Sequence, residues 1–258
     1  MKDCFQPLPD QRRVARSFTR GLASYSRSAV AQAQAAEHLF TVAQGQGLNT
    51  AERIFEFGAG TGFLTQHLST LAPSTFTAND LVPVCADGLR ALVPGAAFHF
   101  LPGPVEALPF SGPYDVIASA STLQWLPDPA PLLRRLCEAL VPGGWLLLSA
   151  YGPAHFPELR ALGLPEGAPG YRDAAGMAAL LPEGIEIACA QDQEITLRFD
   201  SARAVLRHLR DTGVNGGTGH RWGRADLAAF CAAYEARFGG EDGVRLTYAP
   251  SYLVARKR

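Results

Sequence analysis

The chain lacks any apolar run of the roughly 18 residues that a helix needs to cross a bilayer. It also lacks the pattern of a signal peptide, because its first residues, MKDCFQPLPDQRRVARSF, carry acids and prolines where a hydrophobic segment would be needed. We therefore expect a cytoplasmic protein that does not associate with a membrane.

Paired cysteines are absent as well. The five cysteines are scattered along the chain, odd in number, and form no CxxC motif. Such cysteines are typical of small core residues in a reducing compartment, so we expect neither disulfides nor a metal site.

An excess of charge of one sign is also missing, since the formal net charge is −1. No global field therefore draws the protein onto nucleic acid. The local charge is uneven, because residues 1–27 and residues 197–224 each hold six basic side chains against two acidic ones. These segments are either solvated helix faces or a basic surface for an acidic partner, and the sequence leaves both interpretations open.

What the sequence does contain is an alternation of strand and helix patterns. The expected strands are 53–57, 74–80, 96–101, 114–121 and 145–151, with helices at 63–71, 83–92 and 128–140 and a turn, PGG, at 142–144. This order predicts an α/β fold with a Rossmann-like open sheet, mostly parallel, with an antiparallel last strand and helices on both faces.

The two ends of the chain extend this core. Residues 11–44 carry apolar positions at helical spacing, and the regular alternation stops after Tyr151. The later expected helices are 173–181, 201–213 and 225–238, and the expected strands are 184–199 and 244–256, each taken as one strand. We expect one domain over 1–258, with an N-terminal helical cap (1–45), a binding core (50–151), and lid helices with closing strands (152–258).

The stretch IFEFGAGTG at residues 54–62 places Gly58, Gly60 and Gly62 directly after the first strand. A strand-to-helix turn at this point of an open sheet is the expected ligand site. Glycines allow close approach of a ligand to the backbone, and the helix start offers unpaired N–H groups. The dinucleotide pattern G-x-G-x-x-G is not met, because its sixth position is Phe63. Asp80, at the end of the next strand, can accept hydrogen bonds from a ribose diol.

The motif EFGAGTG, followed by Asp80, by YDVIASASTLQWL and by PGGWLLLSA, resembles the S-adenosylmethionine site of the class I methyltransferases. The resemblance implies that Glu56 lies near the ammonium group of S-adenosylmethionine, that Asp80 binds the ribose, and that the loop 103–106 approaches the adenine. An acid usual in that loop is absent at Pro104, with Glu106 nearby. The cofactor-binding residues that we expect are Glu56, Gly58, Gly60, Gly62, Asp80, Leu81, Glu106 and Ser119.

Segments outside the core resemble one family within the class I methyltransferases. RRVARSFTRGLASYSRSAVAQAQAAEHL, FPEL, ITLRFDSARAVLRHLRDTGVNG and LTY look like the corresponding parts of the malonyl-acyl-carrier-protein O-methyltransferases of biotin biosynthesis. This resemblance implies methylation of the free carboxylate of a malonyl group on acyl carrier protein, or on coenzyme A. The methyl ester would then serve as the primer for pimeloyl and biotin synthesis.

The same resemblance implies roles for several residues. Tyr25, Arg210 and Gln124 are expected to be catalytic, with Arg210 orienting the malonyl carboxylate. Trp125 and Arg207 are expected to contact the substrate, and the basic segments to form the carrier-protein surface. Each has a simpler alternative: Arg210 as a solvated helix end, and Tyr25 or Trp125 as core packing. The histidines stand alone in the sequence, so no general base is evident, and a carboxylate acceptor would not need one.

Other functions remain open at this point. The chain could methylate another small carboxylate or a quinone precursor, or bind the cofactor without catalysis. Nucleic-acid methylation is disfavoured, because the chain lacks an N/D-P-P-Y/W motif and a strongly basic face. We expect a monomer.

Overall fold

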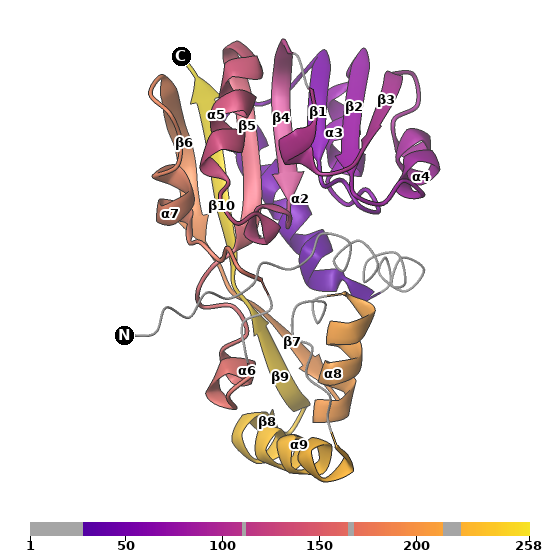
Figure 1. Cartoon of the computed structure of the whole chain (residues 1–258), viewed down its shortest axis with the longest axis vertical. Helices are drawn as coiled ribbons and strands as arrows, with labels where there is room; N and C mark the ends of the chain where they lie inside the picture. The colour runs from indigo at the N-terminus through magenta and orange to yellow at the C-terminus, as the bar shows by residue number, and fades with distance from the viewer. Residues whose placement is uncertain (1–27, 110–111, 165–167, 214–222) are drawn as a thin grey trace.

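The computed structural model describes residues 28–109, 112–164, 168–213 and 223–258. Its main feature is a seven-stranded sheet in the order β3-β2-β1-β4-β5-β10-β6 (Figure 1). The strands are β1 (Arg53–Phe57), β2 (Thr75–Asp80), β3 (Ala97–Pro102), β4 (Tyr114–Ala120), β5 (Leu140–Tyr151), β6 (Ile185–Asp192) and β10 (Pro250–Lys257). Strands β1 to β5 are parallel, and β10 runs antiparallel to both β5 and β6. The expected open sheet with an antiparallel last strand is confirmed.

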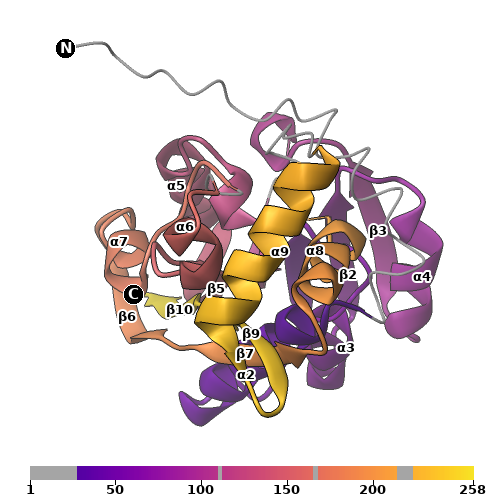
Figure 2. The same cartoon turned by 90° about the horizontal axis from the view of Figure 1, so that it is seen from below.

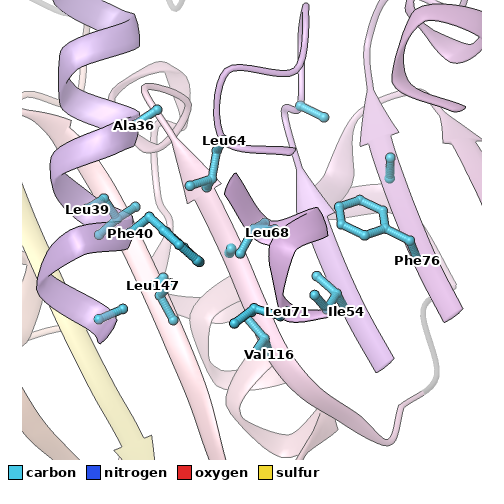
Figure 3. Close-up of a cluster of buried hydrophobic side chains, with 14 of the residues drawn as sticks. Ala36, Leu39, Phe40, Ile54, Leu64, Leu68, Leu71, Phe76, Val116 and Leu147 are labelled. Atoms are coloured by element: carbon cyan, nitrogen blue, oxygen red, sulfur yellow. The ribbon is translucent and has the colours of Figure 1, made fainter. Parts of the chain in front are cut away.

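Helices cover both faces of this sheet. They are α2 (Val30–Gly45), α3 (Thr65–Leu68), α4 (Cys85–Leu92), α5 (Ala130–Ala139) and α7 (Ala174–Ala178), with the short 3₁₀ turns η1 (Ser69–Leu71), η2 (Val105–Ala107) and η3 (Leu123–Trp125). Side chains of α2, α3 and α4 pack on one face, where Leu39 and Phe40 of α2 lie beside Leu147 of β5, and Leu71 lies beside Ile54 of β1 (Figure 3). Alternate strand residues such as Phe55 point to the other face, against α5 and α7. The central strands are nearly continuous apolar runs in the sequence, because both faces of the main sheet are buried.

A smaller sheet lies beyond the carboxyl ends of the central strands (Figures 1 and 2). Its order is β7-β9-β8. It consists of β7 (Ile195–Phe199), β8 (Gly239–Gly240) and β9 (Gly243–Tyr248), with α6 (Pro157–Ala161), α8 (Ala202–Asp211) and α9 (Arg224–Phe238) packed around it. An apolar cluster that includes Ala31 of α2, Tyr151 of β5 and Leu209 of α8 joins it to the main sheet. The cluster thus places the smaller sheet next to the edge where ligands bind in such folds.

This second sheet corrects two sequence expectations, and strand β5 of the main sheet corrects a third. The two long strands expected at 184–199 and 244–256 are each divided, because the chain passes from one sheet to the other at Gln193 and at Ala249. The two crossings are side by side, since Gln193 N donates to Pro250 O at 2.9 Å. A period of two continues through both crossings, so the pattern alone does not reveal a change of sheet. The expected turn at 142–144 lies inside β5, as part of a register shift against β4.

No helix of the described segments combines the length and the apolarity needed to cross a membrane.

Glu158 of α6 fixes the smaller sheet from within. Its side chain is 1% exposed, and its carboxylate accepts hydrogen bonds from Thr247 N at 3.0 Å and Thr247 Oγ1 at 2.7 Å. Arg245 approaches the same carboxylate at 3.3 Å. A buried charge with this number of partners is costly to disrupt, because removal leaves the partners unsatisfied.

We expect Glu158→Ala to lower the free energy of unfolding by about 2–4 kcal/mol, measured by urea denaturation. The control is Glu186→Ala, which removes a solvent-exposed contact to Arg258 at 3.8 Å. The control should change the same quantity by no more than about 0.5 kcal/mol. Equal effects of the two variants would contradict the role given to Glu158.

Candidate functional site

The glycine loop follows β1 and turns the chain into α3. Gly58 and Gly60 have φ values of +63° and +54°, in the left-handed region. A Cβ at Gly58 would collide with the side chain of Thr122, whereas a Cβ at Gly60 would meet nothing within 4 Å. Gly60 is therefore required by its backbone conformation, and the space beside it is open to a ligand.

Asp80 closes this loop from the end of β2. Its Oδ2 accepts a hydrogen bond from Gly60 N at 2.8 Å, and its Oδ1 accepts one from Val82 N at 2.8 Å. Burial raises the pKa of Asp80, and the backbone hydrogen bonds from Val82, Gly60 and Leu81 oppose that rise. An ionised carboxylate has about four acceptor positions, so both oxygens can accept further bonds from vicinal hydroxyls. The predicted contact of Asp80 with a ribose diol is chemically possible here, and Leu81 lies half-buried beside it.

Glu56 lies inside β1, next to the loop. It is 1% exposed, and its Oε2 accepts a hydrogen bond from Thr65 Oγ1 at 2.6 Å. Burial raises its pKa to about 8; the Thr65 bond opposes the rise and the charge of Asp80 adds to it. A carboxyl group of this kind is ready to ionise when a cation approaches, so it fits the ammonium group expected near it.

The loop after β3 is fixed by residues that the sequence analysis did not select. Asn79 Nδ2 donates to Leu101 O and to Gly103 O, both at 2.8 Å. Arg135 Nη1 donates to Glu106 O at 2.8 Å. Both side chains thus bind backbone carbonyls of the loop expected to approach adenine. Their amide and guanidinium groups carry no sequence signal that separates them from ordinary polar residues.

The end of β4 approaches the glycine loop. Ser119 is fully buried and donates its hydroxyl to Phe57 O at 2.7 Å, so it ties β4 to β1. Thr122 Oγ1 lies 3.4 Å from Gly58 O. Between them, Ser121 has a φ of +59°, which is uncommon for a residue other than glycine. Such strain often accompanies a functional position, and no pattern in the sequence indicates it.

Gln124 supports this strained turn. Its side chain is 3% exposed, and Nε2 donates to Ser121 O at 2.7 Å. Its Oε1 is buried and has no hydrogen-bond partner among the described residues. Trp125, in the same 3₁₀ turn, is half-buried. Gln124 therefore contacts the β4 turn, whose Thr122 lies against Gly58 of the glycine loop.

Two further predicted residues, Arg207 and Arg210, lie on α8. Arg207 and Arg210 are exposed on α8, and Arg210 pairs with the adjacent Asp211 at 3.1 Å, with 72% of its side chain exposed. The carboxyl end of α8, which carries Arg210, points toward the main sheet (Figure 1). Tyr25 lies outside the described residues.

Two histidines hold the core between the sheets. His155 Nδ1 accepts a hydrogen bond from Ala249 N at 3.2 Å, and its ring stacks on Tyr151 with centroids 4.2 Å apart. His208 Nε2 and Tyr248 OH are 2.6 Å apart. Burial lowers the pKa of both histidines. Both histidines therefore favour the neutral form and pack in the core between the two sheets.

Comparison with known proteins identifies this architecture. The family model described as "Methyltransferase domain" matches residues 55–148. The chain is 37% identical to the malonyl-[acyl-carrier protein] O-methyltransferase of Chlorobium luteolum, over 97% of each chain. It is 35% identical to the protein of the same name from Porphyromonas gingivalis, over 96% of each. Among solved structures, the N-methyltransferase NodS from Bradyrhizobium japonicum in complex with S-adenosyl-L-homocysteine shares the fold, with a TM-score of 0.54 and 13% identity over 95% of this chain and 98% of that one.

The buried Glu56 gives a testable pH dependence. Between its ordinary pKa of 4.5 and its raised pKa of about 8, Glu56 is protonated in the folded state and ionised in the unfolded state. Its contribution to stability is therefore present below pH 4.5 and is lost as the pH rises toward and through 8. We expect Glu56→Gln to flatten this fall, measured as the free energy of unfolding at several pH values. Glu37→Gln, at an exposed position of α2, is the control and should leave the slope as it is in the parent protein. An unchanged slope in Glu56→Gln would refute the assignment.

Proposed function

The chain belongs to the malonyl-[acyl-carrier protein] O-methyltransferase family, and on that premise we propose that it methylates the free carboxylate of a malonyl thioester on acyl carrier protein. The methyl donor is S-adenosylmethionine, and the methyl ester formed would enter pimeloyl and biotin synthesis. The observation that carries this proposal is the glycine loop closed by Asp80, on a chain that matches these relatives over nearly its whole length.

The residues at the carboxyl edge fit S-adenosylmethionine. The loop 58–62 would lie under its methionine part, with Glu56 near the ammonium group and Asp80 on the ribose diol. The loop from Gly103 to Glu106 would lie against the adenine, held in place by Asn79 and Arg135. When bound, the cofactor supplies a methyl group already activated by a sulfonium charge.

The acceptor needs little further activation, because a carboxylate is ionised at pH 7. The task of the protein is to align the acceptor with the methyl group and to exclude water. We propose that the smaller sheet with α8 and α9 forms the cover over the site, that Gln124 and Trp125 line it, and that Tyr25 closes over the cofactor. Arg210, exposed and paired with Asp211, would stand at the rim and guide the carboxylate inward.

The exposed face of α8 fits an acidic partner. Arg203, Arg207 and Arg210 follow one another at spacings of four and three, so they share one side of the helix. Within the described residues, Arg203 and Arg207 take part in no ion pair. We propose that this side of α8 binds acyl carrier protein. Coenzyme A is the alternative carrier of the malonyl group.

The free thiols of Cys85, Cys137, Cys189 and Cys231 favour the reducing cytoplasm. We further propose that the protein acts there as a monomer.

Gly60→Val tests the function at the loop. The valine would occupy the open space beside the loop and should abolish both binding of S-adenosylhomocysteine, measured by calorimetry, and transfer of labelled methyl to malonyl-acyl carrier protein. Gly184→Val is the matched control, because Gly184 also has a positive φ, +82°, and open space around it. Both variants should lose similar thermal stability, of the order of 1–2 kcal/mol, from backbone strain. If Gly60→Val still bound S-adenosylhomocysteine, the glycine loop would not be the cofactor site.

The double variant Arg203→Glu, Arg207→Glu tests the carrier-protein surface. We expect the KM for malonyl-acyl carrier protein to rise about tenfold or more, with the KM for malonyl-coenzyme A changed less. The control is Arg134→Glu, on α5, which lies away from α8 in both views (Figures 1 and 2). In the parent protein this KM should also rise with salt. An equal effect of the control, or no effect of salt, would argue that the α8 arginines are only solvated.

A further inference from the structure

Several buried polar atoms of the described residues have no hydrogen-bond partner. Among the described residues, the buried side-chain atoms that make no hydrogen bond are Gln32 Oε1, Thr61 Oγ1, Gln124 Oε1, Ser149 Oγ, Tyr151 OH and Tyr252 OH. They come from the first turn of α2, the glycine loop, η3, β5 and β10, all of which meet at or near the carboxyl edge of the main sheet. A buried polar group without a partner costs about 1–3 kcal/mol, so a cluster of them calls for an explanation.

Three of these atoms are hydroxyls on neighbouring strands. Ser149 of β5 and Tyr252 of β10 are direct partners in the antiparallel pair, so their side chains lie on the same face of the sheet. Tyr151 follows Ser149 by two residues and therefore shares that face. Burial raises the pKa of both tyrosines, and the nearby Tyr151 adds to the rise at Tyr252. Both phenols stay protonated at physiological pH and can donate a hydrogen bond. We call Ser149, Tyr151 and Tyr252 the hydroxyl cluster.

The hydroxyl cluster is connected to the glycine loop through the strained turn after β4. Ser121 N donates to Ser149 O at 2.9 Å. Burial raises the pKa of Tyr151, and the nearby Ser121 side chain opposes part of that rise. The Tyr151 hydroxyl nevertheless makes no hydrogen bond of normal distance and angle. The next residue, Thr122, contacts Gly58. One turn of chain therefore separates the hydroxyl cluster from the expected cofactor loop.

The hydroxyl cluster also lies to one side of that loop. The residues expected to hold the cofactor come from β1, β2, the loops that follow β1, β2 and β3, and, for Ser119, β4, whereas the hydroxyl cluster comes from β5 and β10, beyond β4. Strands in a sheet are about 4.8 Å apart, so β5 is about 10 Å from β1. The hydroxyl cluster is therefore separated by β4 from the strands whose ends carry the glycine loop and Asp80.

The part of the chain that the structure describes places no buried arginine or lysine beside these hydroxyls. Within the described residues, the buried polar side chains include neither arginine nor lysine. An anion that reaches this place therefore meets neutral O–H donors. Arg210, the residue expected from the sequence to hold the carboxylate, is in solvent.

We propose that the hydroxyl cluster binds the carboxylate of the acceptor, and that this carboxylate is positioned by neutral hydroxyl donors. The inference rests on the proposed function. In the transfer, a carboxylate oxygen lone pair forms the new C–O bond, the electrons of the broken S–C bond stay on sulfur, and no proton moves. A guanidinium paired with the carboxylate would reduce its nucleophilicity, whereas hydroxyl donors fix its orientation with less withdrawal of charge. Because an anion and a cation combine into neutral products, neutral surroundings favour the reaction.

Access to the hydroxyl cluster requires its cover to move. The cover includes α2, because His38 of this helix meets the Tyr252 ring edge-on at 4.7 Å and Ala31 packs in the same apolar cluster as Tyr151. Gln32 lies in the first turn of α2, and its Oε1 makes no hydrogen bond. This atom therefore does not anchor the first turn of α2 to the rest of the protein. The unpaired hydroxyls themselves destabilise the closed arrangement, and acceptor oxygens would supply the missing partners.

The test uses the full-length protein and the variants Tyr151→Phe, Tyr252→Phe and Ser149→Ala. Each removes an unpaired hydroxyl, so we expect an unchanged or raised Tm. We also expect kcat/KM for malonyl-acyl carrier protein to fall about tenfold or more, as for a lost hydrogen bond to a charged group. The Kd for S-adenosylhomocysteine should stay as it is in the parent protein. Tyr234→Phe is the matched control, because the buried Tyr234 donates to Arg245 O at 2.7 Å. This control should lower the Tm and leave kcat/KM unchanged.

Several results would overturn the proposal. One is an unchanged kcat/KM in all three variants. Another is a fall in Tm equal to that of Tyr234→Phe, because such a fall would show that the hydroxyls make stabilising hydrogen bonds in the folded protein. Weakened binding of S-adenosylhomocysteine would mean that the carboxylate bound here is that of the cofactor. A parent protein inactive on malonyl thioesters would instead refute the proposed function, and the Tm comparison would still show whether the hydroxyls are unpaired.

Discussion

The hydrogen bond from Gly60 N to Asp80 Oδ2, 2.8 Å long, joins the ends of β1 and β2 and holds the glycine loop in its left-handed conformation. The rest of the site is arranged around it. Gly58 touches Thr122 only because the loop is in this position, and Thr122 continues into the turn that reaches Ser149. A change in the loop would therefore move the β4 turn as well as the cofactor site.

A second constraint concerns charge. The groups buried near the carboxyl edge are kept neutral at moderate pH: Glu56 by burial, His155 by burial, and the tyrosines by their high pKa values. The arginines of α8 are outside, in solvent. This arrangement suits a reaction in which opposite charges combine, because each isolated charge inside the site would be expensive to bury. With the carrier-protein surface proposed on α8, recognition of an acidic partner would be separate from the chemistry.

Much of the main sheet could be predicted from the sequence. The apolar runs, the glycines at 58, 60 and 62 and the acid at Asp80 act locally, and local patterns predict local structure. The smaller sheet could not be predicted, because alternation continues where the chain leaves one sheet for the other. The hydroxyl cluster was missed for a related reason: Ser149 and Tyr252 become neighbours only through the register of β5 and β10. The φ of Ser121 was hidden because no glycine marks it.

The function proposed for this chain is the transfer of a methyl group onto the free carboxylate of a malonyl thioester. A methyl-transfer assay that compares malonyl-acyl carrier protein with succinyl-acyl carrier protein, whose acyl group is one methylene longer, tests this function. We expect a base-labile methyl ester on the malonyl substrate and much slower transfer to the succinyl one, because the longer chain misplaces the carboxylate. No transfer to the malonyl substrate, with S-adenosylhomocysteine still bound, would contradict it.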